Sequence, residues 1–317
     1  MKRILVILLL ISQSALAQTD KKTPVSLIYE AIAATNATLW LAEDAHLFEK
    51  YGLNAKVVNA RGAVPVQALV SGSVEFGAFS GSSAIAAVLA GSDIVLVAAK
   101  GNFAVMSFWV RRDSPIKSLA DVRGKIIGVT RPGSATHMIA RLALKSAGLD
   151  EREVRFLHHG GLPESFASLD KGIVDAAMGS PPRPGFRELV DLSALKIPFL
   201  QGAIEVKRSF LQNRRDTVLN LLKAYVETIN LAKQKPELAI TAISKRMRVP
   251  VEMVKPVYQP HENVLEAVPY VRRDSVQVIL DQYPKEQSKG LSYDKLVDNS
   301  LLQQLEESGF IKNLYRK

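Results

Sequence analysis

Short apolar runs rich in β-branched residues alternate with segments of helical pattern along the first third of the chain. The apolar runs predict strands, and apolar positions spaced every three or four residues predict the helices between them. This alternation is typical of parallel strands with helices on both faces of a sheet. The predicted strands are 25–33, 53–59, 74–79 and 94–99, and the predicted helices are 39–50, 64–70 and 83–89.

The alternation restarts after a polar break at 111–124, so the chain predicts a second α/β unit. From residue 216 the pattern is almost entirely helical. A helical tail does not easily form a core of its own, and we expect it to pack on the first unit. The predicted strands here are 125–129, 154–158, 174–178 and 189–192, and the predicted helices are 134–147, 164–169, 217–233, 236–247, 272–282 and 299–308.

These patterns predict two lobes joined by two chain crossings. Residues 24–110 and 204–317 are expected to form lobe 1, and residues 111–203 to form lobe 2. The crossings are expected at 111–113 and 198–203. The length also suits two domains.

The first 17 residues have the pattern of a secretory signal peptide. Lys2 and Arg3 precede the apolar run 4–11, and Ala15-Leu16-Ala17 has the form of a cleavage site. The apolar run is shorter than the roughly 20 residues of a membrane span. A buried first strand or helix is the alternative. We expect cleavage after Ala17 and a periplasmic location.

The composition adds two exclusions. The chain has no cysteine, which rules out disulfides, thiolate metal sites and a lipid-modified N-terminal cysteine. The formal net charge is +10, but the basic residues are scattered and form no stripe interleaved with aromatic residues. The charge therefore indicates a solvated surface rather than binding to nucleic acid.

Loops that follow a predicted strand and open a helix are the candidate ligand site. Ligands of open α/β sheets lie at the carboxyl ends of strands, against helix N-termini with unpaired N–H groups. Gly133 would let the backbone approach a ligand, and Ser134 could donate a hydrogen bond, with a helix cap as its alternative role. The candidates are Thr35, Asn36, Thr38, Trp40, Ser80, Gly81, Ser82, Ser83, Arg131, Gly133, Ser134, Ala135, Thr136, His137, Gly160, Gly161, Ser180 and Pro181.

Two candidate features have a simpler explanation. Trp40 lies one turn into a predicted helix, where an aromatic residue is as often part of the core. His158 and His159 suggest a metal site, but adjacent side chains on a strand point to opposite faces. No metal and no cofactor is predicted.

Two runs resemble motifs of a known family: Leu47-Phe48-Glu49-Lys50-Tyr51-Gly52-Leu53 and Leu119-Ala120-Asp121-Val122-Arg123-Gly124-Lys125. Further similar segments are 40–46, 67–72, 74–77, 298–300 and 307–311. The chain resembles the periplasmic binding proteins for nitrate, taurine, alkanesulfonates and thiamin-pyrimidine precursors over nearly all of its length after residue 17. One departure is His46, where glycine is usual. If that position needs a positive φ, histidine tolerates it at modest cost.

The resemblance implies a two-lobed periplasmic-binding-protein fold of type II, with parallel-dominated sheets, flanking helices and a helical C-terminal part. It also implies that the lobes close over a ligand and that the closed form docks on an ABC permease in the inner membrane. We expect a monomer that delivers a small organic anion or oxyanion to this importer.

An exported hydrolase or a sensor-type binding protein on the same fold is the alternative. Enzymes of related branches use a cysteine-rich motif or a cysteine nucleophile, neither of which this chain can supply. The sequence also lacks G-x-S-x-G, Walker A and G-x-G-x-x-G motifs. These observations favour binding over catalysis.

Overall fold

The computed structural model describes residues 22–179 and 185–316. The expected signal peptide and its cleavage site lie outside these residues, as do two site candidates, Ser180 and Pro181.

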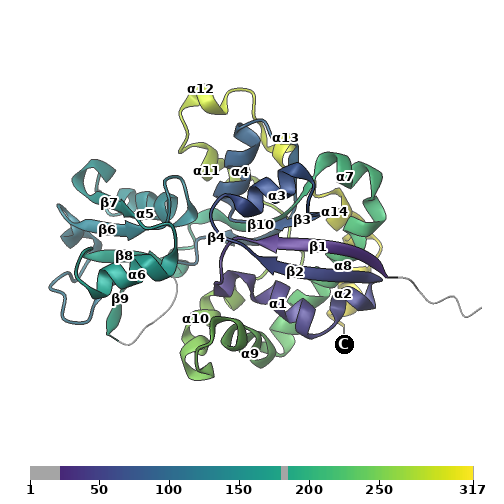
Figure 1. Cartoon of the computed structure of the whole chain (residues 1–317), viewed down its shortest axis with the longest axis horizontal. Helices are drawn as coiled ribbons and strands as arrows, with labels where there is room; N and C mark the ends of the chain where they lie inside the picture. Colours follow the sequence, from purple (N-terminus) through teal and green to yellow (C-terminus); the bar gives the residue numbers. More distant parts are fainter. Residues whose placement is uncertain (1–21, 180–184, 317) are drawn as a thin grey trace, which may run out of the picture.

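Two five-stranded sheets form two lobes that lie side by side (Figure 1). The sheet of lobe 1 has the strand order β2-β1-β3-β10-β4, and the sheet of lobe 2 has the order β7-β6-β8-β5-β9. The strands of lobe 1 are β1 (Thr23–Tyr29), β2 (Leu53–Asn59), β3 (Phe76–Ala78), β4 (Ile94–Phe103) and β10 (Pro198–Lys207). Those of lobe 2 are β5 (Ser107–Arg111), β6 (Ile126–Val129), β7 (Arg155–His158), β8 (Ala176–Gly179) and β9 (Phe186–Asp191).

The sheets are mixed rather than dominated by parallel pairs, which corrects one expectation from the sequence. In lobe 1, β1 runs parallel to β2 and β3, whereas β10 runs antiparallel to β3 and β4. In lobe 2, β6 runs parallel to β7 and β8, whereas β5 runs antiparallel to β8 and β9. The antiparallel strands β5 and β10 are those that directly follow a passage between the lobes.

The strand pairing places both passages earlier in the chain than the sequence suggested. β5 pairs within lobe 2, so the first passage is 104–106 rather than 111–113. β10 pairs within lobe 1 from Pro198 on, so the second passage is 192–197 rather than 198–203. One buried apolar cluster includes residues of both lobes, with Leu96 and Phe199 from lobe 1 and Phe108 from lobe 2.

Helices cover both faces of the lobe 1 sheet, with α1, α8, α9 and α10 on one face and α3, α4 and α11 on the other (Figure 1). The N-terminal part supplies α1 (Ala37–Asp44), α2 (Leu47–Lys50), α3 (Val64–Ser71) and α4 (Gly81–Leu89), and lobe 2 has α5 (Ala135–Ser146) and α6 (Leu162–Asp170). The C-terminal part supplies α7 (Arg208–Asn213), α8 (Arg215–Gln234), α9 (Pro236–Met247), α10 (Val251–Asn263), α11 (Arg273–Leu280), α12 (Lys285–Ser288), α13 (Tyr293–Leu296), α14 (Ser300–Glu307) and α15 (Phe310–Leu314). Short 3-10 turns lie at Ala34–Asn36, Leu119–Val122, Glu151–Glu153 and Ser193–Leu195.

The C-terminal helices pack on lobe 1. One side of α8 is apolar and buried, and its Tyr225 hydroxyl donates a hydrogen bond of 3.1 Å to the carbonyl of Ala99 in β4. Leu301 and Leu305 of α14 join the same core cluster as Leu27 and Phe76 of the sheet. The helical tail therefore completes the core of lobe 1.

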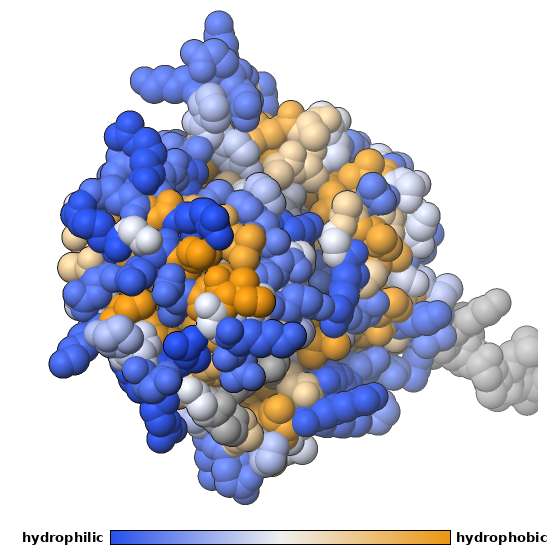
Figure 2. Space-filling model, turned by 60° about the vertical axis from the view of Figure 1, so that its left-hand side comes forward, coloured by the Kyte–Doolittle hydropathy of each residue, from blue (hydrophilic) through white to orange (hydrophobic). Residues whose placement is uncertain are grey.

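Apolar side chains at the surface lie in small patches among hydrophilic ones on the face that brings lobe 2 forward (Figure 2). Exposed large apolar residues are spread over both lobes, for example Val64 and Val70 in lobe 1 and Ile173 in lobe 2. None of the described helices is long and apolar enough to cross a membrane.

The predicted helix 39–50 is divided into α1 and α2 at His46. His46 adopts the left-handed conformation with φ 55°. A positive φ at this position agrees with the glycine that is usual there in the family the sequence resembles. Its side chain is 80 % exposed and makes only a 3.5 Å approach to Glu49. The strained backbone is therefore not offset by burial of the side chain.

Replacing His46 with glycine should stabilise the protein. Glycine removes the left-handed strain and loses part of that gain to the greater entropy of the unfolded chain, so we expect a rise in the free energy of unfolding of about 0.5–1 kcal/mol. Denaturant titration measures the change. Lys223→Gly, in the middle of α8, is the control and should lose about 0.5–1 kcal/mol. A loss of stability in His46→Gly would contradict the claim that the backbone at His46 is strained.

A second expectation concerns acid stability. His261 in α10 is 6 % exposed, and burial lowers its pKa to about 4, with a smaller opposing effect from Asp191. The unfolded chain has the ordinary histidine pKa near 6.5, so it binds a proton in a range where the folded protein does not. Stability from His261 is therefore fully present above about pH 6.5 and is lost as the pH falls towards 4.

We expect His261 to contribute roughly 3 kcal/mol to the loss of stability across this window. His261→Gln should remove that part of the pH dependence, as measured by urea unfolding at several pH values. Equal slopes for the wild type and His261→Gln would show that burial does not depress this pKa.

Candidate functional site

A cavity of about 160 Å³ lies between the two lobes. Lobe 1 contributes the ends of β1, β2 and β3 and part of β4, and lobe 2 contributes the loops before α5 and α6. The lining is rich in polar side chains: Glu30, Thr35, Asn36, Asn59, Arg61, Ser80, Lys100, Thr130, Arg131, Ser134, Thr136 and Gln201.

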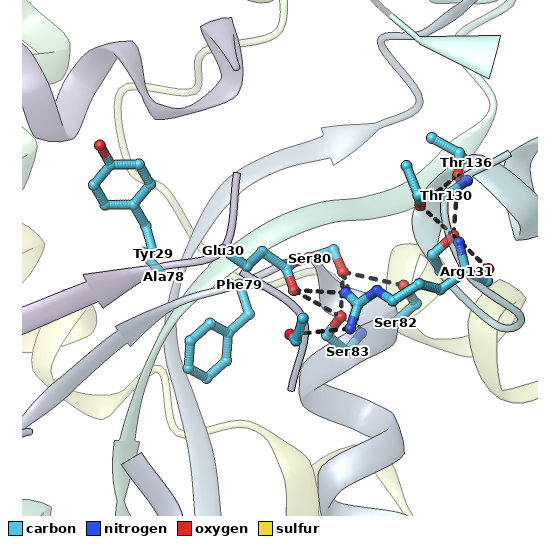
Figure 3. A network of polar contacts seen from close by, with 12 residues as sticks. Tyr29, Glu30, Ala78, Phe79, Ser80, Ser82, Ser83, Thr130, Arg131 and Thr136 are labelled. Carbon is cyan, nitrogen blue, oxygen red and sulfur yellow. Dashed lines mark hydrogen bonds and ion pairs between the residues drawn. The ribbon is translucent and has the colours of Figure 1, made fainter. Parts of the chain in front are cut away.

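Arg131 spans the cavity from lobe 2 to lobe 1 (Figure 3). Its Nη2 lies 3.3 Å from Oε2 of Glu30, and its Nη1 donates a hydrogen bond of 3.0 Å to the carbonyl of Gly62. The Glu30 side chain is 12 % exposed. A second ion pair, Arg61 to Glu164, also joins the lobes at 3.3 Å, but both of its side chains are exposed. The Glu30–Arg131 pair is therefore the better shielded of these two bridges.

Glu30 also occupies the N-terminal end of α4. Its Oε1 accepts a hydrogen bond of 2.6 Å from the backbone N–H of Ser80, and its Oε2 accepts one of 3.0 Å from the Ser83 hydroxyl. The Ser80 hydroxyl caps the helix by accepting from the N–H of Ser83 at 3.2 Å. The positive end of this helix dipole is thus already balanced by a carboxylate of the same chain.

Three hydroxyl groups form a small network at the start of α5. Ser134 is the N-cap: its Oγ accepts from the N–H of His137 at 3.5 Å and donates to the carbonyl of Arg131 at 2.7 Å. The hydroxyls of Thr130 and Thr136 lie 2.9 Å and 3.0 Å from Ser134 Oγ. Ser134 therefore serves as a helix cap whose proton is already committed to a carbonyl.

The N-terminus of α6 is built differently. Its N-cap is Gly161, which has no side chain to accept hydrogen bonds from the first turn. Gly160, Gly161 and Leu162 all line the cavity. Pro163 has no N–H, so the N–H of Leu162 is the first donor that α6 can offer to a group in the cavity.

Lys100 lies at the lobe 1 side of the cavity and donates hydrogen bonds to Asn36 Oδ1 at 2.6 Å and the Ala78 carbonyl at 3.2 Å. Burial lowers the pKa of Lys100 to about 8, and the neighbouring Glu205 partly opposes this. Burial likewise raises the pKa of the fully buried Glu205 carboxyl, whose Oε2 accepts from the N–H of Phe79. Each side chain favours the charged form of the other and so offsets part of the cost of burial.

Nine of the candidates named from the sequence line the cavity: Thr35, Asn36, Ser80, Arg131, Ser134, Ala135, Thr136, Gly160 and Gly161. The polar residues that the sequence reasoning missed include Glu30, Lys100 and Gln201. Lys100 lies within β4, and only the strand order of the lobe 1 sheet brings it to the cavity. Glu30 was missed because the sequence placed it inside the predicted strand 25–33, whereas β1 ends at Tyr29 and leaves Glu30 at the edge of the sheet.

The other described candidates lie away from the cavity lining. Trp40 is fully buried and packs edge-to-face on Tyr29 at 5.9 Å, and Thr38 is buried in the same helix. A Cβ on Gly81 would lie 2.4 Å from the Leu200 carbonyl, so glycine there permits close packing of α4 on β10. The remaining candidates, Ser82, Ser83 and Gly133, also lie outside the cavity lining.

His137, a ligand-site candidate from the sequence, does not supply a positive charge. Its Nδ1 accepts a hydrogen bond of 3.0 Å from the N–H of Gly133, and its ring packs against Phe156 and His158. Burial, followed by the nearby His158 and Arg141, lowers its pKa to about 4. The ring is therefore neutral at physiological pH.

His158 and His159 point to different surroundings. His158 lies 5.3 Å from the ring of His137, whereas His159 lies near Gly128 on the other side of the strand. Within 22–179 and 185–316, no three histidine or acidic side chains are grouped closely enough to hold a metal ion.

A family model described as "NMT1/THI5 like" matches residues 33–239, which is more than half of the chain. The chain belongs to the NMT1/THI5-like family. A relative from Brachyspira hyodysenteriae, named as a candidate ABC transporter periplasmic binding protein, is 26 % identical over 218 residues. That match covers 61 % of this chain and 61 % of the relative, which is less than two thirds of its length.

Solved structures share the fold of this NMT1/THI5-like chain. The alkanesulfonate-binding protein of Xanthomonas axonopodis pv. citri is 19 % identical, with a TM-score of 0.71 over 90 % of this chain and 98 % of that one. The periplasmic nitrate-binding protein of Synechocystis PCC 6803 is 15 % identical, with a TM-score of 0.74 over 91 % and 89 %. A desulfurization enzyme is 15 % identical, with a TM-score of 0.67 over 90 % and 99 %. The fold therefore occurs in both binding proteins and an enzyme.

Ser134→Ala should reduce the stability of the unliganded protein by about 1 kcal/mol, because α5 loses its N-cap. Thermal unfolding followed by circular dichroism measures the change. Ser146→Ala, near the end of the same helix, removes an exposed hydroxyl that bonds only within the turn and should stay within about 0.5 kcal/mol. An unchanged midpoint for Ser134→Ala would mean that the cap contributes nothing to the folded state.

Proposed function

We propose that this protein is an extracytoplasmic solute-binding protein that encloses a small ligand between its lobes and delivers it to an ABC importer. The observation that carries the proposal is the polar cavity between the lobes, which Arg131 crosses from one wall to the other. Membership of the NMT1/THI5-like family and the likeness to binding proteins support it. Export through the N-terminal signal and action as a monomer are part of the same proposal.

Two kinds of donor favour a ligand with an anionic or strongly accepting group. The first turns of α5 and α6 reach the cavity with their N-terminal ends, where the helix dipole favours negative charge. The guanidinium of Arg131 adds a fixed positive charge beside them. We place the accepting end of the ligand on this lobe 2 side.

Closure follows from the two short passages between the lobes. Rotation at 104–106 and 192–197 would separate the two cavity walls without breaking either sheet. In the closed form, Arg131 contacts Glu30 and Gly62 of the opposite lobe. The permease would then receive a surface that exists only when the lobes are closed.

Catalysis on the same fold is the second candidate, because a desulfurization enzyme is among the structural neighbours. The chain has no cysteine nucleophile, and Ser134, a hydroxyl of the cavity, already gives its proton to a carbonyl. Binding without chemical change is therefore the function that the geometry supports best.

A thermal-shift screen with nitrate, sulfonates, carboxylates and phosphonates, followed by calorimetry, tests this function. A true ligand at a hundredfold excess over Kd should stabilise the protein by about 2.7 kcal/mol. Arg131→Ala should weaken binding about tenfold to a hundredfold, whereas Arg112→Ala, at an exposed arginine outside the cavity, should not. Mass spectrometry should recover the ligand unchanged. Steady turnover would make the protein an enzyme, and no shift across the screen would count against binding.

A further inference from the structure

Among the described residues that line the cavity, Glu30 is the one with an acidic side chain. It directly follows β1, and its carboxylate is 12 % exposed between the two lobes. A charged group that is so well shielded from water is costly unless it is paired. The groups around Glu30 therefore indicate which kind of ligand the cavity can bind.

Three donors hold this carboxylate in place: the N–H of Ser80, the hydroxyl of Ser83 and the guanidinium of Arg131 (Figure 3). The N–H of Ser80 lies at 2.6 Å, so the carboxylate is fixed against the end of α4 rather than free to turn away. An ionised carboxylate has about four acceptor positions. One position therefore remains for a donor from the cavity.

The fixed charges around the cavity are arranged as two poles. The charges of Glu30 and Arg131 cancel as a pair, and Lys100 interacts electrostatically with the carboxyl groups of Glu205 and Glu30. On the lobe 1 side, the end of α4 is already occupied by Glu30. Lobe 2 contributes the start of α5, which Ser134 caps, and the start of α6, whose N-cap Gly161 has no side chain.

A simple anion does not match this arrangement. It would gain from the lobe 2 donors but would place its charge near the Glu30 carboxylate in a small, shielded space, and like charges at such distances disfavour each other. Glu30 lines the cavity and contacts Arg131 from the opposite lobe, so an anion held by Arg131 lies near the Glu30 carboxylate. A ligand that carries a hydrogen-bond donor at the end near Glu30 avoids this repulsion.

We propose that Glu30 is a specificity-determining residue that selects bipolar ligands. The anionic or accepting end lies against Arg131 and the starts of α5 and α6, and an ammonium or comparable N–H donor bonds to Glu30. This inference rests on the proposed solute-binding function and narrows its substrate class to small ligands with both groups.

Matched pairs of probes test the inference: β-alanine with propanoate, aminomethanesulfonate with methanesulfonate, and aminoethylphosphonate with ethylphosphonate. Calorimetry on the full chain should show the aminated member of at least one pair binding about tenfold to a hundredfold tighter than its partner, the effect of one charge-assisted hydrogen bond. Glu30→Gln should remove this preference and leave the simple anion bound as tightly or more tightly.

Glu164→Gln is the matched control, because it also neutralises a carboxylate that bridges the lobes, but an exposed one outside the lining. It should keep the preference for the aminated member. If Glu30→Gln does not fold, Glu30→Asp keeps the charge at a shorter reach, and it should lower affinity for the aminated probe while still favouring it over the simple anion.

Two results would overturn the inference. One is equal or tighter binding of the simple anion in every pair, including the case in which no aminated probe binds. The other is an unchanged preference in Glu30→Gln. Binding of simple anions alone would refute the role of Glu30 and leave the solute-binding function standing, whereas failure of the whole anion screen would count against that function itself.

Discussion

The ion pair between Glu30 and Arg131 is the contact on which the geometry of the cavity depends. It joins the end of β1 in lobe 1 to the loop after β6 in lobe 2, and the hydrogen bond from Arg131 to Gly62 adds a second point of attachment. A partly shielded, charge-assisted pair of this kind is stronger than a surface ion pair. Because one member also balances the dipole of α4, the pair couples lobe closure to the charge of the ligand site.

Much of the fold is predictable from periodicity, and the exceptions have physical causes. α9 was predicted with its observed bounds, and β2 likewise, because each has a clear pattern and sharp ends. β5 and β10 were missed as strands because they are buried apolar runs next to other apolar residues, without alternation or a turn signal. α10 was missed because it contains Pro256 and Pro260, residues that normally argue against a helix.

The site was predictable where it depends on loops and unpredictable where it depends on strand order. Arg131, Ser134 and Ser80 follow strands and open helices, which is a signal visible in the sequence. Lys100 lies within a strand, and its place beside Asn36 arises from the tertiary arrangement of lobe 1. The cavity role expected of Trp40 was wrong, because the apolar side of α1 turns this ring into the core.

Lobe closure across the Glu30–Arg131 bridge is the central claim, and the distance between the lobes tests it most directly. The chain has no cysteine, so a pair of nitroxide labels at Val64→Cys and Ile173→Cys, exposed positions on lobe 1 and lobe 2, reports this distance by pulsed electron resonance without competing sites. The account predicts that Arg131→Ala shifts the unliganded distance distribution towards longer or broader values. Identical distributions with and without Arg131 would contradict it.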